Sequence, residues 1–382
     1  MSNPWKLEAV AQALLAAADA AAAGVIRSTA AATDKEGRFP RQSLDALRAA
    51  GLMRLVSAKE VGGQGQGLRA AAAVSERIAR ECPSTAMILM MHYAATAVVE
   101  KHGNRELRAG LAANDQLTTL AFSESGSRSH FWVPVSTATR NGGVYKLNAA
   151  KQLITAAGHC DVYVWSSKPA EAAGLSTIWA VPGNAPGLSV SGAFDGLGLR
   201  GNSSAPMVAK DVSVSAAQRL GEDGQGFDIM MGVVMPNFSL LHCAVSVGVM
   251  EGAIARTVAH VTESEYSYDH SKLADLPQVR GHVARMRIKT DLVRGFLLDA
   301  LDALEQGRED AMLRVLESKV AGSETSLEVN DLAMRVCGGA AFRKDVEVER
   351  FFRDSRAATV MAPVSDALYD FIGKAVCGMP VF

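Results

Sequence analysis

The spacing of hydrophobic and polar positions changes twice along the chain. Up to residue 117, apolar residues recur at helical intervals, and a helix predicted from Phe39 ends at Gly51, a common stop signal. Residues 118–226 instead hold short β-branched and aromatic runs separated by Gly and Pro turns, which predicts a small, mostly antiparallel β-domain. Helical spacing returns at residues 227–382. The pattern predicts an α+β protein, mainly α, with a helical N-terminal domain (1–117), a middle β-domain (118–226) and a C-terminal helical bundle (227–382).

Individual elements can be placed within these three parts. Strands are expected at residues 117–123, 145–147, 162–166, 177–181 and 207–214. Long helices are expected at residues 227–261, 277–304 and 312–336. The first of these should break near Pro236, because proline lacks the N–H that a helix interior uses.

Charge and cysteine content exclude several classes of function. The 39 basic and 40 acidic residues give a net charge of −1, which favours neither a nucleic acid nor a membrane surface as a partner. We expect no membrane span, since the alanine-rich residues 9–26 hold Gln12 and Asp19 and predict an amphipathic helix. The five cysteines are scattered without metal-ligand spacing, so we expect no metal site and a reducing, cytoplasmic location.

A stretch near the C-terminal end carries the most specific pattern. Residues 332–366 read LAMRVCGGAAFRKDVEVERFFRDSRAATVMAPVSD. The paired Gly338 and Gly339 let the backbone approach another group closely, and residues 347–354 place charges on one helix face and two phenylalanines on the other. The stretch resembles the C-terminal signature of the acyl-CoA dehydrogenase superfamily. There a Gln-x-x-Gly-Gly turn and a Glu-Arg-x-x-Arg-Asp segment precede a loop that holds the catalytic glutamate.

This resemblance covers nearly the whole chain and implies a fold, a cofactor and partners. The order of helices, β-domain and helices is that of the superfamily, so a β-barrel-like middle domain and a C-terminal four-helix bundle are expected. The resemblance further implies FAD, an acyl thioester substrate, and an electron-transfer flavoprotein or a flavin reductase as redox partner. A homotetramer, or at least a homodimer, is expected because the superfamily builds its flavin site across subunits.

The first flavin motif is expected just after the first strand. Residues 120–129, LAFSESGSRS, resemble the superfamily's Thr-Glu-Pro-x-Ala-Gly-Ser segment, whose backbone lies along the flavin ring. The resemblance gives flavin contacts to Phe122, Ser123 and Ser129. Taken alone, the segment is an ordinary serine-rich turn after a strand.

The second flavin motif lies at residues 151–161, KQLITAAGHCD, which resemble the superfamily's Lys-x-Trp/Phe-Ile-Thr segment. In the superfamily the threonine, here Thr155, hydrogen-bonds flavin N5, the atom that accepts hydride. Leu153 replaces the aromatic residue that flanks the ring. The two motifs occur at the separation that the superfamily has, and together they favour flavin binding over two unrelated turns.

The flavin diphosphate site departs from the superfamily pattern. There an Arg-x-x-Phe-Gly segment of one subunit and the Gln-x-x-Gly-Gly turn of a neighbour hold the FAD. Here the first segment reads EYSYD at residues 265–269, and the second has Arg335 in place of Gln, followed by Gly338 and Gly339. Our hypothesis is that Arg335 supplies the lost positive charge, because a guanidinium suits phosphate. The alternative is a solvated arginine near a helix end.

The catalytic base is the largest departure. Removal of an α-proton from a thioester needs a positioned base, and the superfamily's glutamate position is Ala362 here. The alternative glutamate position on the first helix after the β-domain falls at Phe238 or Ser239. Two candidates remain: Asp366, one helical turn after Ala362, which is alternatively a helix cap, and His92, which is alternatively a pocket-wall residue. His242 is expected to be structural.

Four functions fit this sequence. The leading interpretation is an FAD-dependent oxidoreductase of the acyl-CoA dehydrogenase type. A flavin monooxygenase of the same fold needs no α-proton base, because reduced flavin and O₂ carry out its chemistry. A desulfinase-like reaction and a non-catalytic FAD- or CoA-binding relative are the further alternatives, and the fold does not choose among them.

Overall fold

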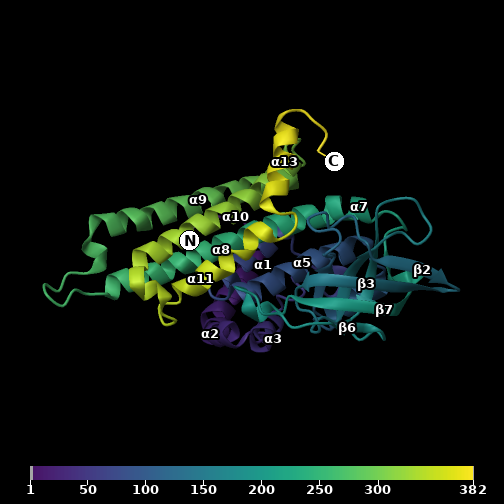
Figure 1. Ribbon diagram of the computed structural model, residues 1–382, viewed down its shortest axis with the longest axis horizontal. Helices are drawn as coiled ribbons and strands as arrows, with labels where there is room; N and C mark the ends of the chain where they lie inside the picture. Colours follow the sequence, from purple (N-terminus) through teal and green to yellow (C-terminus); the bar gives the residue numbers. More distant parts are fainter. Residues whose placement is uncertain (1–2, 382) are drawn as a thin grey trace.

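A computed structural model describes residues 3–381, and its first part is helical (Figure 1). The alanine-rich start forms one long helical run that a π-helical turn at Ala22–Ile26 interrupts. Helices α4 and α5 are almost wholly buried, since α4 packs against α8 and α5 packs against both α8 and the first strand. The helices are α1 (Ala9–Ala21), α2 (Arg27–Glu36), α3 (Arg41–Ala49), α4 (Leu68–Ala79), α5 (Pro83–His102) and α6 (Arg105–Ala113).

The middle part holds two four-stranded sheets, with strand orders β1-β4-β5-β8 and β2-β3-β7-β6. Only β1 and β4 pair in parallel; the other pairs of named strands are antiparallel. The strands are β1 (Thr118–Ala121), β2 (Thr137–Asn141), β3 (Val144–Ile154), β4 (Val162–Ser167), β5 (Thr177–Pro182), β6 (Leu188–Val190), β7 (Ala205–Ser215) and β8 (Arg219–Leu220). The five predicted strands are β1, β3, β4, β5 and β7.

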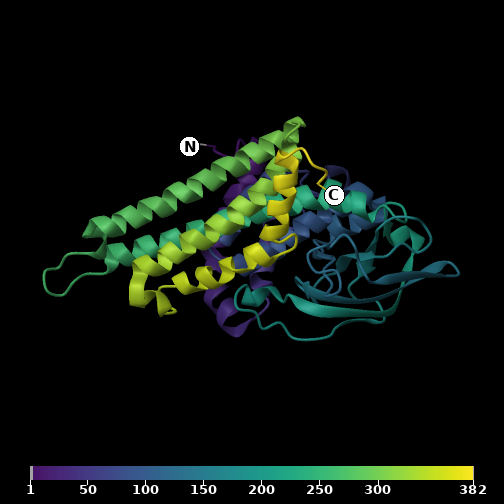
Figure 2. The ribbon, with the colours of Figure 1, turned by 45° about the horizontal axis from the view of Figure 1, so that its top comes forward.

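The third part is a bundle of long helices, and Figures 1 and 2 show it on the opposite side of the molecule from the sheets, with α13 standing out from it. Its elements are α7 (Gly226–Ile229), a π-helix η5 (Met230–Val234), α8 (Met235–Glu263), α9 (Pro277–Gln306), α10 (Ala311–Cys337), α11 (Val348–Ser355), α12 (Ala357–Val360) and α13 (Ser365–Val376). Short 3-10 turns lie at Lys59–Val61, Arg200–Asn202, Ala216–Gln218, Leu273–Asp275 and Gly338–Phe342. The predicted class, α+β and mainly helical with the β-domain in the middle, is confirmed.

The helical run around Pro236 does not break as expected. It continues from Gly226 to Glu263, and the π-helical turn η5 ends immediately before the α8 turn that contains Pro236. The wider π turn accommodates the proline ring and its missing N–H without ending the helix.

Two helical runs, Ala9–Glu36 and Gly226–Glu263, are long and apolar enough in composition to cross a membrane. In the second run 94% of the apolar window is buried inside the protein, which is the position of a core helix. In the first run α1 packs against α4.

Helix α11, the charged segment of the C-terminal signature, joins all three parts. Arg353 forms a two-pronged ion pair with Asp34 of α2, with N–O distances of 2.9 and 2.5 Å, and donates to the Leu197 carbonyl at 3.1 Å. The neighbouring Asp354 accepts a hydrogen bond from the backbone N–H of Leu199 at 2.6 Å. The charged face of α11 therefore fixes the bundle to the N-terminal helices and to the β-domain.

Asp354 gives this junction a pH dependence. Burial raises the pKa of Asp354 to about 6, because the charged carboxylate loses its hydration. Between about pH 4 and pH 6 the native state therefore holds a proton that the unfolded chain has released, so stability falls as pH rises through this window. Asparagine keeps the acceptor for the Leu199 N–H and lacks the ionisation.

We expect Asp354→Asn to be more stable than the wild type above about pH 6, by on the order of 3 kcal/mol, and the gap to shrink toward pH 4. Thermal unfolding of both proteins at a series of pH values measures the gap. A gap that stays constant with pH, or a variant less stable than the wild type at pH 8, would contradict this account.

Candidate flavin site

A β-bulge shapes the second flavin motif. The β3–β7 register shifts between Lys151 and Ile154, so that the two residues between them leave the ladder. Gln152 N–H turns instead to the Ser123 carbonyl, at 2.9 Å. Leu153 takes a left-handed conformation with φ 53° and stays 67% exposed. The bulge thus connects the two predicted flavin motifs and presents an apolar side chain on the domain surface.

A buried ion pair locks the two motifs together. Lys151 is 0% exposed, and its Nζ lies 2.5 Å from Glu124 Oε1, within the first motif. The same amine donates to the Ser166 carbonyl at 2.9 Å and to the Ser166 hydroxyl at 2.8 Å. Burial lowers the pKa of Lys151 to about 8, and the Glu124 charge opposes that shift. Both groups are therefore ionised at neutral pH.

Glu124 also fixes the far end of the first motif. Its carboxylate accepts hydrogen bonds from the backbone N–H groups of Val135 and Ser136, at 2.6 and 3.1 Å, and from the Ser136 hydroxyl. A carboxylate with this many donors remains charged, and its pKa lies below its ordinary value despite burial. The Glu124 side chain therefore ties the start of the loop between residues 122 and 136 to its end.

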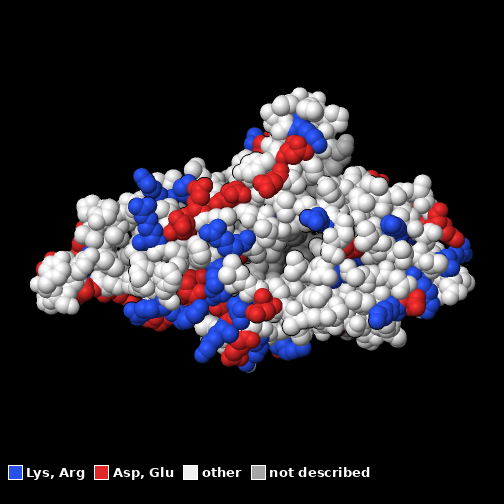
Figure 3. Space-filling model, in the orientation of Figure 1, with Lys and Arg blue, Asp and Glu red and all other residues white. Residues whose placement is uncertain are grey.

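The predicted flavin contacts of the two motifs lie around this pair. Phe122 is buried and stacks on Phe131, while Ser123 and Ser129 are half-buried. The Thr155 hydroxyl lies 3.3 Å from the Ser204 hydroxyl, just beyond the bulge. Figure 3 shows a hollow in the surface between the helical bundle and the sheets. Half-exposed hydroxyls beside an exposed apolar side chain fit a flat, polar-edged ring.

The remaining predicted flavin residues lie elsewhere. Arg335, Gly338 and Gly339 form the turn between α10 and α11, which Figure 1 places at the end of the bundle away from the sheets. All three are exposed, and Gly338 has φ 55° and ψ −135°, a conformation that favours glycine. A single copy of the chain does not bring this turn to the two motifs of its own β-domain.

His92 is a buried link between domains. Its Nε2 donates to the Met53 carbonyl at 2.6 Å, and its Nδ1 accepts from the Thr118 N–H, the first residue of β1, at 3.2 Å. Burial lowers the pKa of His92 to about 4, so the ring is neutral. Both ring nitrogens are thus bonded to backbone groups, and the ring links α5 to the start of β1.

Asp366 lies in the first turn of α13 and is exposed. It does not cap the helix, since the N-cap position is Val364. Phe371, on the buried face of α13, packs against Trp132 with ring centroids 6.0 Å apart. The helix that carries Asp366 therefore touches the loop that holds the first flavin motif, while Ala362, at the superfamily's glutamate position, is half-buried before it.

A second lysine, Lys319 of α10, is also buried, and the sequence does not predict a role for it. Its Nζ donates to the carbonyls of Met361 and Ala358, at 3.2 and 3.4 Å, so it holds the segment that leads to Ala362. Burial lowers the pKa of Lys319 to about 7. The sequence held little signal for this role, because a lone lysine inside a long helix normally indicates a solvated position.

Comparisons with known proteins show the family to which the chain belongs. The family models described as the acyl-CoA dehydrogenase N-terminal, middle and C-terminal domains match residues 9–112, 119–212 and 224–377. The chain belongs to the acyl-CoA dehydrogenase family. It is an FAD-dependent oxidoreductase of this family, as its two flavin motifs predicted.

Individual relatives match over most of their length. The chain is 29% identical to cyclohexane-1-carbonyl-CoA dehydrogenase of Geobacter metallireducens over 346 residues, covering 88% of this chain and 89% of that protein. The structure of butyryl-CoA dehydrogenase from Megasphaera elsdenii superposes with a TM-score of 0.90 at 19% identity, covering 99% of this chain and 100% of the other. The FAD complex of PigA superposes with a TM-score of 0.88 at 19% identity, covering 99% of both chains.

Removing the amine of the buried pair tests its role. We expect Lys151→Met to destabilise the protein by about 3–5 kcal/mol, because Glu124 would remain buried without its counter-charge. The two flavin motifs would loosen, so FAD should also be lost on purification. Thermal unfolding and the FAD content per chain measure the two effects.

Lys146→Met is the matched control for this variant. Lys146 lies on the same strand, but its amine reaches the surface and donates to the Ser213 hydroxyl. We expect this control to keep both stability and FAD. A Lys151→Met protein as stable and as yellow as the control would show that the pair does not hold the site.

Proposed function

We propose that this protein oxidises an acyl-CoA thioester at its Cα–Cβ bond, with FAD as the electron acceptor. The observation that carries the proposal is the joining of the two flavin motifs through the β3 bulge and the Lys151–Glu124 pair. The named relative from Geobacter is an acyl-CoA dehydrogenase that matches nearly end to end, which supports the substrate class.

Each group of residues has a proposed task. Bound FAD supplies an acceptor for the hydride that leaves the β-carbon. The backbone at Phe122 and Ser123 would support the flavin ring, and the Thr155 hydroxyl would bond its edge. Ser129 would lie near the pyrophosphate. Leu153, the most exposed apolar side chain of the bulge, would cover one ring face in place of an aromatic residue.

Ala362 has no basic group that could accept the α-proton. We propose Asp366 as the proton acceptor. Its helix α13 packs on the loop that holds the first flavin motif, through Phe371 and Trp132, and its carboxylate is exposed and does not cap the helix. His92 is the weaker candidate, since both of its ring nitrogens bond to the backbone.

A second candidate function is a flavin monooxygenase of the same fold. The observation that favours it is the absence of a carboxylate at both superfamily base positions, which hold Ala362 and Phe238 or Ser239. Such an enzyme would take electrons from a flavin reductase, whereas a dehydrogenase would pass them to an electron-transfer flavoprotein.

We also propose that the active form is a homodimer or homotetramer. Arg335 and the Gly338–Gly339 turn lie at the opposite end of the molecule from the β-domain motifs, so a second copy would have to bring them to the flavin diphosphate. A cytoplasmic location is proposed from the cysteines: all five are free thiols, and four of them are buried.

The deciding experiment is an anaerobic titration of the purified flavoprotein with a panel of acyl-CoAs. Bleaching of the flavin absorbance without any added reductase is the expected result, and Asp366→Asn should slow the bleaching without changing FAD content. Absence of bleaching throughout the panel would reject the proposal. Reduction only by a flavin reductase, followed by oxygen consumption, would support the monooxygenase.

Arg335 offers a test of the shared diphosphate site. We expect Arg335→Ala to weaken FAD binding roughly tenfold or more, because a guanidinium–phosphate contact is a charge-assisted hydrogen bond. Dialysis followed by measurement of FAD content gives the affinity. Arg343→Ala, on the same turn but already paired with Asp345, is the control. Equal FAD retention in both variants would refute a phosphate contact for Arg335.

A further inference from the structure

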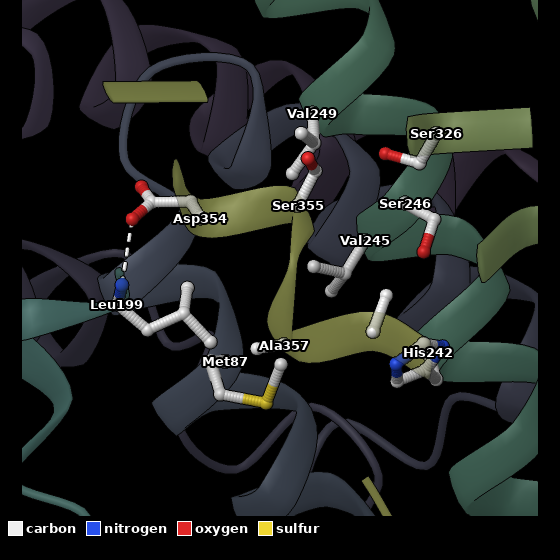
Figure 4. A pocket seen from close by; sticks show the side chains of 11 residues that line it. Met87, Leu199, His242, Val245, Ser246, Val249, Ser326, Asp354, Ser355 and Ala357 are labelled. Atoms are coloured by element: carbon white, nitrogen blue, oxygen red, sulfur yellow. Dashed lines mark hydrogen bonds between the residues drawn. The ribbon is translucent and has the colours of Figure 1, made fainter. Parts of the chain in front are cut away.

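A small, partly open cavity of about 20 Å³ lies where α5, α8, α10 and the α11–α12 segment meet (Figure 4). Its apolar walls come from Met87 of α5, Leu199, and Val245 and Val249 of α8. The polar side chains that line it are His242, Ser246, Ser326, Asp354 and Ser355. A cavity needs about 10–15 Å³ to hold one water molecule, so this one has room for a single polar group but not for a ring or a long chain.

His242 is the unsatisfied member of this set. The ring is 1% exposed, and its Nδ1 has no hydrogen-bond partner among residues 3–381. Burial and the nearby Lys319 charge hold the pKa of His242 well below its ordinary value, so the ring is neutral. A neutral imidazole nitrogen buried without a partner is unusual, because native proteins pair such groups with protein atoms or with a bound molecule.

The neighbours of His242 complete a small polar wall. Ser246 follows one turn later on the same face of α8, and Ser326 lies opposite on α10, where it accepts only a long bond of 3.4 Å from Asn330. Figure 4 shows this wall at one end of the cavity and Asp354, already bonded to the Leu199 N–H, at the other. At the His242 end, the cavity therefore has polar side chains that can form further hydrogen bonds.

The cavity adjoins the segment that leads to the superfamily's glutamate position. Ala357 and Ala358 of α12 form its wall on that side, and Lys319 holds the carbonyls of Ala358 and Met361. Only methyl side chains stand on this wall. This methyl-lined wall belongs to the segment that ends at Ala362, beside which the proposed function would place the acyl group.

We propose that His242, with Ser246 and Ser326, is a specificity-determining subsite for one hydrogen-bonding group on the acyl chain, such as a hydroxyl, with a water molecule in its place when the chain is purely aliphatic. The proposal rests on the proposed acyl-CoA function. It revises the purely structural role that the sequence predicts for His242.

The test compares pairs of ligands that differ by one hydroxyl. Butyryl-CoA and hexanoyl-CoA are each matched with the terminally hydroxylated analogue, and dissociation constants are read from the perturbation of the flavin spectrum. We expect the wild type to bind the hydroxylated member of at least one pair roughly tenfold more tightly. His242→Leu should abolish or reverse this preference, while His242→Asn, which places a polar atom near the Nδ1 position, should keep it.

Thr257→Val is the control for folding and for loss of a buried polar group on α8. Thr257 is fully buried, but its hydroxyl bonds to the Ala253 carbonyl, away from the cavity lining. This variant should behave as the wild type in every pair. Preference for the alkyl member in both pairs, or an unchanged preference in His242→Leu, overturns the subsite.

A crystal structure of the wild-type protein separates this inference from the proposed function. An ordered water or ligand oxygen within hydrogen-bond distance of His242 Nδ1 is expected whether or not acyl-CoAs bleach the flavin. A dry cavity would overturn the subsite even if the protein proves to be an acyl-CoA dehydrogenase. Failure of every CoA thioester to bind would instead reject the proposed function.

Discussion

The flavin side of this protein depends on a single buried charge pair. Lys151 and Glu124 are both withdrawn from water, and neither would remain ionised there without the other. Their partners belong to the loop after β1, to β3 and to β4, so the pair sets the relative position of all three. The bulge that exposes Leu153 follows directly after Lys151, and the pair therefore also fixes where the bulge can form. An apolar pair could fill the same volume, but it would not satisfy the backbone N–H groups of Val135 and Ser136.

A second set of charged residues, on α11, attaches the bundle to the rest of the molecule. Helix α11 places Phe351 in the core and directs Arg350, Arg353 and Asp354 at backbone and side-chain groups of the other two parts. Several of these contacts are hydrogen bonds to backbone groups, so they form only when the partner segments are correctly positioned. The signature segment thus determines how the domains meet, and the cavity beside His242 is a consequence of that meeting.

The sequence predicted the elements well and the site only in part. Long periodic helices and apolar strands were placed correctly because their pattern is local. Strand β2 was missed since its TATRN sequence is polar and mostly exposed, and its pairing with β3 is determined by tertiary contacts. Lys151 and Glu124 both lie in the predicted flavin motifs, but the sequence pattern does not predict that they are buried together as an ion pair. The two ring bonds of His92 are likewise long-range contacts, which its position in the sequence does not reveal.

Comparison of the two buried lysines shows what has changed at the glutamate position. Lys151 faces a carboxylate and stays charged. The hydrogen-bond acceptors around Lys319 are carbonyl oxygens, and burial lowers the pKa of Lys319 to about 7. The Lys319 amine therefore titrates near neutral pH. A neutral amine still donates to the Met361 and Ala358 carbonyls, so the segment before Ala362 keeps its shape across that titration. The segment that ends at Ala362 is thus held by hydrogen bonds, although Ala362 itself carries no acidic side chain. Lys319, Ser323 and, across the cavity, His242 bring an amine, a hydroxyl and an imidazole to the α12 segment. Such a surrounding suits a substrate that brings its own hydrogen-bonding group.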